Sequence, residues 1–126
     1  MPEGQHSISL GRLKKRSEFL RVRGGRSWRA ASLVLQARER GTEDCPGVAR
    51  FGFTATKRLG GAVTRNRARR RLKETVRAIA GDRARPGYDY VVIARQGALT
   101  RKFGDMQKDL GVAFERVHHN AIEGRA

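Results

Sequence analysis

Guanidinium groups are the most chemically distinctive feature of this sequence, and they gather between residues 57 and 77. Glu74 is the one acidic residue of this segment, which is otherwise basic, apolar or small. A guanidinium is planar and donates paired hydrogen bonds whose geometry matches two oxygens of a phosphate. The chemistry that this pattern indicates is therefore the binding of phosphates.

A helix must position these side chains. Four apolar residues recur at steps of four, four and three, which is the spacing of one helical face: Ala68, Leu72, Val76 and Ile79. We predict a helix over about 63–80, entered through a turn at Gly60-Gly61 and ended by Gly81. A helical wheel places the polar residues away from the apolar stripe or along its flank: Asn66, Arg67, Arg69, Arg70, Arg71, Lys73 and Arg77.

This arrangement favours an anionic partner over two simpler explanations. Like charges three or four residues apart repel by about 0.2–0.5 kcal/mol per pair, so an isolated helix gains nothing from them. A solvated face would mix Glu with Lys, and a disordered basic tail would not hold apolar residues at helical spacing. We therefore predict contact with nucleic acid.

The whole composition supports a polyanionic partner. The chain of 126 residues fits one domain, and 28 Lys plus Arg against 12 Asp plus Glu give a net charge of +16. Cys45 is the only cysteine, so an internal disulfide and a multi-cysteine zinc site are excluded, and a reducing compartment fits. No apolar run reaches the roughly eighteen residues of a membrane span, and the first residues lack the apolar core of a signal peptide. We expect a cytoplasmic protein without a membrane partner.

Around the basic helix we expect a small sheet and two further helices. A short helix over about 17–23 would be capped by Ser17 and ended by Gly24-Gly25 in left-handed conformations. Strands are predicted at 32–37, in the segment 51–56 and at 88–94, with the loop 38–47 joining antiparallel neighbours. A last helix over about 100–118 would bury one stripe: Phe103, Met106, Leu110, Phe114 and Val117.

The strand containing Phe51 and Phe53 has a second, smaller face. Gly52 would leave room there for a strand of nucleic acid, and Thr54, Thr56 and Lys57 would offer hydrogen-bond donors. We divide the chain into a mobile N-terminal segment at 1–9, a single RNA-binding α/β domain at 10–119 and a mobile C-terminal tail at 120–126.

We find no set of residues for catalysis by the protein itself. The sequence has no Gly-x-x-x-x-Gly-Lys-Ser/Thr loop, no carboxylate cluster for two metals, and no nucleophile with an obvious base. His6, His118 and His119 fall in ends that we expect to be mobile, and we interpret the adjacent pair as solvated tail residues rather than metal ligands. We expect neither a protein-bound metal nor a small-molecule substrate.

The amino-acid sequence of the basic segment is distinctive enough to indicate a family. Gly61-Ala62-Val63, Arg65-Asn66-Arg67 and the run 69–74 together resemble the signature of the bacterial ribonuclease P protein family, whose members assist a catalytic RNA. The segments at 13–22, 50–58 and 88–95 resemble the family's first helix, central strand and last strand, so that residues 10–118 are covered.

The resemblance implies a fold. It is a compact two-layer α-β sandwich with a small mixed sheet, in the order α-β-β-β-α-β-α and with a left-handed crossover around the basic helix. Our reading of the residues lacks the extra short strand, and general rules favour a right-handed crossover, as in about 98% of parallel strand-helix-strand units.

The resemblance also implies a function, namely removal of the 5′ leader from precursor tRNA by a catalytic RNA that holds the active site and, with the substrate, Mg²⁺. The residues that it assigns to the RNA subunit lie on the basic helix: Arg65, Asn66, Arg67, Arg69, Arg70, Arg71 and Lys73. The residues that it assigns to a leader-binding cleft between the sheet and the first helix are Phe19, Thr54, Thr56, Lys57 and Arg58. Arg23 and Gln36 stand where the family often has aromatic residues, so we expect weaker base stacking and stronger phosphate contact.

Two other functions stay open at this point. A small ribosomal protein or RNA chaperone would share the basic character without a role in tRNA processing. A DNA-binding regulator is disfavoured, because Arg69-Arg70-Arg71 has no Asn or Gln on the same turn to read bases.

Overall fold

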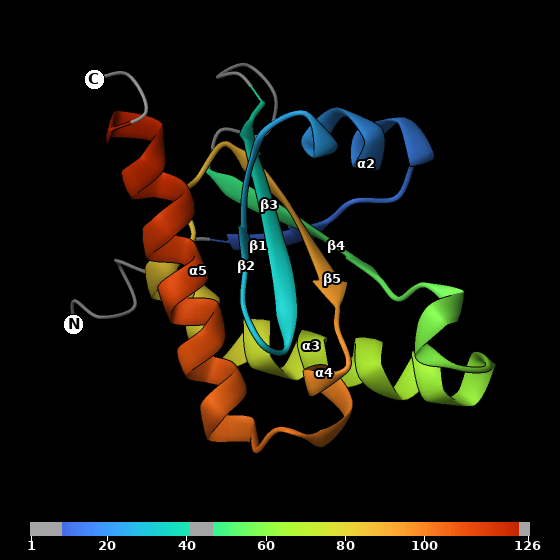
Figure 1. The fold of residues 1–126 in the computed structure, drawn as a ribbon. Helices are drawn as coiled ribbons and strands as arrows, with labels where there is room; N and C mark the ends of the chain where they lie inside the picture. The colour runs from blue at the N-terminus through green and yellow to red at the C-terminus, as the bar shows by residue number, and fades with distance from the viewer. Residues whose placement is uncertain (1–8, 41–46, 124–126) are drawn as a thin grey trace.

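The computed structural model describes residues 9–40 and 47–123 (Figure 1). The expected helices and strands are present, and two short strands and two helical turns are added to them. In chain order the elements are β1 (Ser9–Arg12), α2 (Arg16–Arg23), β2 (Arg26–Arg29), β3 (Leu33–Glu39), β4 (Val48–Thr54), the 3-10 turn η1 (Lys57–Leu59), α3 (Ala62–Arg83), β5 (Tyr88–Ala94), α4 (Gly97–Thr100) and α5 (Phe103–Glu123).

The five strands form one mixed sheet in the order β1-β4-β5-β3-β2. β4 is parallel to both β1 and β5, whereas β3 is antiparallel to β5 and to β2. The prediction that the loop after β3 joins neighbouring strands was wrong, because β5 lies between β3 and β4. The continuous apolar run of β5 explains this position, since a central strand is covered on both faces. Cys45, in that loop, lies outside the described residues.

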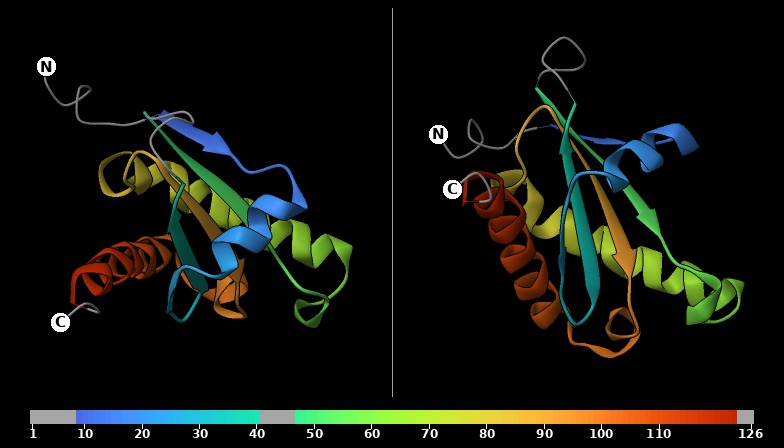
Figure 2. Two further views of the ribbon diagram at one scale, coloured as in Figure 1. Left: turned by 90° about the horizontal axis from the view of Figure 1, so that it is seen from above. Right: turned by 45° about the horizontal axis from the view of Figure 1, so that its top comes forward.

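The helices cover the two faces of the sheet unequally. α3 and α5 pack together over one face and form the sandwich, whereas the short α2 covers part of the other face against β3 and β5. The parallel unit β4-α3-β5 is as expected, and its left-handedness stays a prediction of the resemblance. Figures 1 and 2 show η1 and the first turns of α3 projecting beyond the strands.

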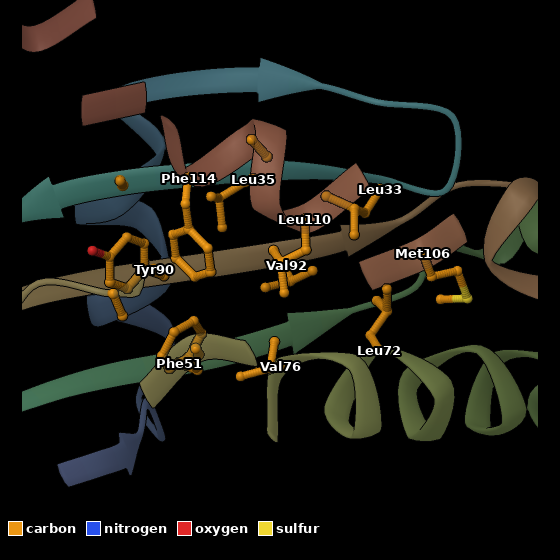
Figure 3. Close-up of a cluster of buried hydrophobic side chains, with 14 of the residues drawn as sticks. Leu33, Leu35, Phe51, Leu72, Val76, Tyr90, Val92, Met106, Leu110 and Phe114 are labelled. Atoms are coloured by element: carbon orange, nitrogen blue, oxygen red, sulfur yellow. The ribbon is translucent and has the colours of Figure 1, made fainter. Parts of the chain in front are cut away.

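The main core lies between the sheet and the two long helices (Figure 3). In Figure 3, Val76 of α3 lies beside Phe51 and Leu72 lies near Met106 of α5, and the Phe51 and Tyr90 ring centroids are 4.9 Å apart. The predicted stripe of α5 is buried from Met106 to Val117. Phe103 was predicted in the stripe but is 40% exposed, because α5 begins at this residue, before the helix reaches the core.

The start of α2 and the conformation of the residue that ends it differ from the predictions. α2 begins after Lys15 rather than Ser17, because the Glu18 carboxylate accepts hydrogen bonds from the backbone N–H groups of Lys14 and Lys15, at 2.8 and 3.0 Å. Gly24 is right-handed, with φ of −80°, so a left-handed residue does not end this helix. Gly25 is required for a different reason, because a Cβ there would lie 2.1 Å from the carbonyl oxygen of Ala37.

α3 continues through Gly81 to Arg83, past the predicted end. Pro86 explains the later end, because a proline disfavours helical conformation in the residue before it. α5 extends to Glu123, so the predicted domain boundary at residue 119 falls inside the helix. Ser9 already belongs to β1, whereas residues 1–8 and 124–126 lie outside the described part of the chain.

Candidate nucleic-acid interface

The first two turns of α3 present a surface of one charge. Asn66, Arg67 and Arg70 are exposed, and Arg65 and Arg69 are half-buried. The first turn contains no acidic residue, and Gly61, at the N-cap, gives no side-chain hydrogen bond to the helix. The positive end of the helix dipole therefore adds to the guanidinium charges, which favours an anion at this end.

Two contacts orient side chains on this surface. A guanidinium N–H of Arg69 donates to the side-chain oxygen of Asn66, one turn earlier. The ammonium nitrogen of Lys73 lies 5.9 Å from the centre of the Phe53 ring. The exposed Lys57 and Arg58 of η1 precede the same helix, so positive charge continues from the end of β4 into α3.

Arg71 differs from the other predicted RNA-binding residues of this helix. Its Nη1 donates to the carbonyl oxygen of Ala98 at 2.7 Å, and its Nη2 donates to that of Arg101 at 2.6 Å. Arg71 thus ties α3 to the segment that contains α4. The sequence placed this residue on the flank of the apolar stripe, which is the position from which a long side chain reaches a neighbouring element.

A cleft of about 440 Å³ lies between α2 and the sheet. Phe19 and Thr54, both predicted for leader binding, line this cleft together. Thr56, Lys57 and Arg58 do not line it, and all three are exposed beyond the end of β4. The other lining residues are Lys14, Arg16, Leu20, Arg23, Gln36, Val91 and Ile93.

The two residues that depart from the family pattern both line the cleft. Arg23 comes from the last turn of α2 and Gln36 from the middle of β3. Phe19 is the only aromatic residue among those that line the cleft, alongside Lys14, Arg16 and Arg23. This composition is suited to phosphate contact and offers one ring for stacking.

Gly52 has a packing role that the sequence did not indicate. A Cβ at this position would lie 2.4 Å from Cε2 of Phe19, so the ring of Phe19 lies directly over the backbone of β4. The expected room for nucleic acid at Gly52 is therefore occupied by Phe19.

A buried ion network fastens α2 to the sheet. Asp89 of β5 is fully buried, and its carboxylate accepts hydrogen bonds from Arg21 at 2.9 Å, Arg40 at 2.8 Å and Arg50 at 2.9 Å. Arg50 also bonds Glu18 of α2 at 3.3 Å. Burial acts to raise the pKa of Asp89, but the hydrogen bonds from the three arginines outweigh it and lower that pKa. The sequence signal was an acidic residue within an otherwise apolar strand.

His118 is buried, so its interpretation as a solvated tail residue was wrong. Its Nε2 lies 2.8 Å from the hydroxyl oxygen of Tyr90, within the core under α5. Burial and the charge of Arg85 lower the pKa of His118 to about 4. His119 is exposed.

Neither a metal cluster nor a membrane span is found within residues 9–40 and 47–123. No group of three or more His, Cys, Asp or Glu side chains is placed there to hold a metal ion. No helix of that part is long and apolar enough to cross a membrane.

Comparison with known proteins identifies relatives of this chain. The family model described as Ribonuclease P matches residues 9–118. The ribonuclease P protein component of Caulobacter vibrioides is 44% identical over 114 residues, covering 90% of this chain and 75% of the relative. That of Ruegeria pomeroyi is 42% identical over 113 residues, covering 89% and 90%.

Solved structures agree with the sequence comparison. The ribonuclease P protein of Thermotoga maritima superposes with a TM-score of 0.69 at 26% identity, covering 84% of this chain and 96% of that one. The Staphylococcus aureus protein gives 0.64 at 29% identity, covering 87% and 94%. With its match over residues 9–118 and relatives above 40% identity, this chain belongs to the ribonuclease P protein component family.

Proposed function

We propose that this chain is the protein subunit of ribonuclease P, an endoribonuclease whose RNA subunit carries the active site, and that it promotes 5′ maturation of tRNA. One observation carries this proposal beyond family membership: the cleft under α2 holds three cations and one ring, and the exposed start of α3 carries cations with no acidic residue in its first turn. In this role the protein contributes charge and shape, and its reacting partners are RNA. We expect it to act in the cytoplasm, where bacterial tRNA precursors are processed.

In the proposed complex the two surfaces have separate tasks. The start of α3 contacts the catalytic RNA through five residues: Arg65, Asn66, Arg67, Arg69 and Arg70. The cleft under α2 takes the single-stranded leader, with Phe19 against a base and Lys14, Arg16 and Arg23 against phosphates. Thr56, Lys57 and Arg58 are exposed between the end of β4 and the start of α3, and Lys73 shares a hollow with Phe19 of the cleft and Arg69 of the helix.

This division explains how a protein without catalytic residues accelerates cleavage. Precursor is bound more tightly than product, because only the precursor has a leader to place in the cleft. Cations between two RNA molecules also offset their mutual repulsion, so less Mg²⁺ is needed. The proposal assigns Mg²⁺ to the RNA subunit and the substrate, where it supplies activation of the attacking water.

The test is 5′ processing of precursor tRNA by the cognate catalytic RNA at low Mg²⁺, with and without the protein. We expect the protein to restore cleavage, and a variant with Arg65→Ala and Arg67→Ala to lose that effect. A variant with Lys102→Ala and Lys108→Ala is the matched control, because both residues are exposed, just before and on α5, which covers the face of the sheet opposite the cleft. An RNA chaperone without a role in tRNA processing would leave cleavage unchanged, and that result would refute the proposal.

Leader binding should also depend strongly on salt. If six to ten phosphates are contacted, affinity falls by about 10³–10⁵ between 50 and 200 mM salt. Affinity for a leaderless tRNA should fall less over the same range, because the cleft is then empty. Equal salt dependence for the two RNAs would contradict leader binding in the cleft.

A further inference from the structure

The sheet leaves part of β4 uncovered at one edge. β1 pairs with β4 only as far as Arg12, which lies opposite Phe51. Beyond that point β4 continues as Gly52, Phe53 and Thr54, which pair with β5 on one side. No described strand pairs with them on the other side. This free edge lies between α2 on one face of the sheet and α3 on the other.

Two hollows of about 190 and 330 Å³ lie along this edge, and we call them together the β4-edge groove. Arg12, Phe53 and Lys73 line both hollows. The smaller hollow also includes Phe19 and Arg69, and the larger one includes Leu10 and Arg77. Phe19 lines the cleft under α2 as well, so the β4-edge groove and that cleft meet at its ring.

The chemistry of the β4-edge groove is that of a path for single-stranded nucleic acid. Its charged residues are all cations, from Arg12 of β1 and from Arg69, Lys73 and Arg77 on three successive turns of α3. Phe53 is half-buried and adds an aromatic ring between them. A cationic groove with an aromatic ring binds backbone phosphates and stacks bases without needing a particular sequence.

We propose that the β4-edge groove binds single-stranded RNA and continues the cleft under α2 around the edge of the sheet to the basic face of α3. A duplex does not fit this path, because its stiffness prevents a turn around one strand. That the natural strand is the 5′ leader of precursor tRNA rests on the proposed function. The affinity of the groove for single-stranded RNA rests on its own residues.

Binding of unstructured oligouridylate to the full-length protein tests this groove directly. We choose RNAs of about 4 and about 12 nucleotides, within the range of site sizes known for single-strand binders. The variant carries Arg12→Gln and Arg77→Gln, two exposed residues of the β4-edge groove outside the surfaces assigned above. The matched control carries Lys102→Gln and Lys108→Gln, two exposed residues just before and on α5 that line neither the groove nor the cleft.

Each lost phosphate contact lowers the slope of log affinity against log salt by about 0.7 for single strands. For the longer RNA, the slope of the groove variant should therefore be smaller by about 1.4 than that of the wild type. Between 50 and 200 mM salt, the affinity of the variant should then fall about sevenfold less than that of the wild type. The slope for the shorter RNA and that of the control variant should stay unchanged. An unchanged slope for the longer RNA, or an equal loss in the control variant, would overturn the proposal.

Glycine amide resonances locate the bound strand independently. Gly11 and Gly52 line the two hollows, whereas Gly104 and Gly111 line a separate groove between α3 and α5. The longer RNA should shift the first pair and leave the second pair in place; no shift at Gly11 would overturn the proposal. Neither measurement needs the catalytic RNA, so a failure here is distinct from a failure to restore cleavage at low Mg²⁺.

Discussion

Replacing Asp89 by Asn should both destabilise the protein and weaken the attachment of α2 to the sheet beside the cleft. The substitution keeps the size of the side chain but removes the one negative charge that three arginines share. Arg40 should be affected most, because its side chain is only 1% exposed; it also donates hydrogen bonds to the carbonyl oxygens of Tyr88 and Val48, which the substitution leaves in place. Breaking a buried ion pair from one side costs about 3–5 kcal/mol, and the retained carbonyl bonds favour the lower figure.

A loss of about 3 kcal/mol is a large part of the 5–15 kcal/mol that stabilises a typical domain. Urea unfolding at neutral pH measures it, with Asp82→Asn as the control, since Asp82 is an exposed carboxylate on α3. In the wild type the lowered pKa of Asp89 supplies stability that is complete above the ordinary value of 3.8 and is lost as pH falls through the folded-state pKa. Asp89→Asn should remove this acid-side loss.

The same variant tests how α2 is held over the cleft. Arg21 of α2 bonds Asp89 directly, and Arg50 links Asp89 to Glu18 of the same helix. Folded Asp89→Asn protein should therefore distinguish precursor from leaderless tRNA less well, while keeping its affinity for the catalytic RNA. A variant as stable as the wild type, with unchanged discrimination, would refute this account of the network.

Three further predictions concern single positions. Gly52→Ala should displace the ring of Phe19 and destabilise the protein by about 1–3 kcal/mol, with weaker binding of oligouridylate; unchanged affinity would contradict the packing argument. The free energy of unfolding should fall as pH drops from about 6.5 to about 4, because His118 binds a proton in the unfolded state but not when buried in the folded state. Urea unfolding at a series of pH values should show a smaller fall for His118→Gln, and an equally large fall in this variant would assign the effect to another group. Arg71→Gln should leave two carbonyls near α4 without their donor and lower the free energy of unfolding by about 1–3 kcal/mol, whereas a purely RNA-binding Arg71 would leave stability unchanged.

Much of the fold could be predicted from local sequence patterns. The alternation around Phe51 and Phe53, the stripe of α3 and the apolar run of β5 each describe how one element meets the core, and each was confirmed. Such patterns are readable because the side-chain period of a strand or helix is fixed by its backbone. β1, with four residues, is too short to show a period, and so it was missed.

The functional surface was harder to predict, because it is assembled from distant segments. Phe19 and Thr54 meet in the cleft as expected, but the order of the strands decides that Gln36 and Val91 meet them there. The role of Gly52 was misjudged for the same reason, since only the position of α2 shows that Phe19 fills the space above it. His118 was misjudged because the pattern did not indicate that α5 continues beyond it.

Net charge alone overstated the surface available to RNA, because arginine serves two purposes in this protein. Arg40 and Arg50 are bound to a buried carboxylate, and Arg71 and Arg95 donate to backbone carbonyls at 2.6–2.7 Å. An arginine is committed to structure where an acid or an unsatisfied carbonyl lies within reach, and both are set by packing rather than by spacing along the chain. The start of α3 has no acidic residue in its first turn, so its guanidinium groups retain the capacity for an external anion. That local shortage of acids, more than the surplus of +16, distinguishes the proposed RNA-binding side of the molecule.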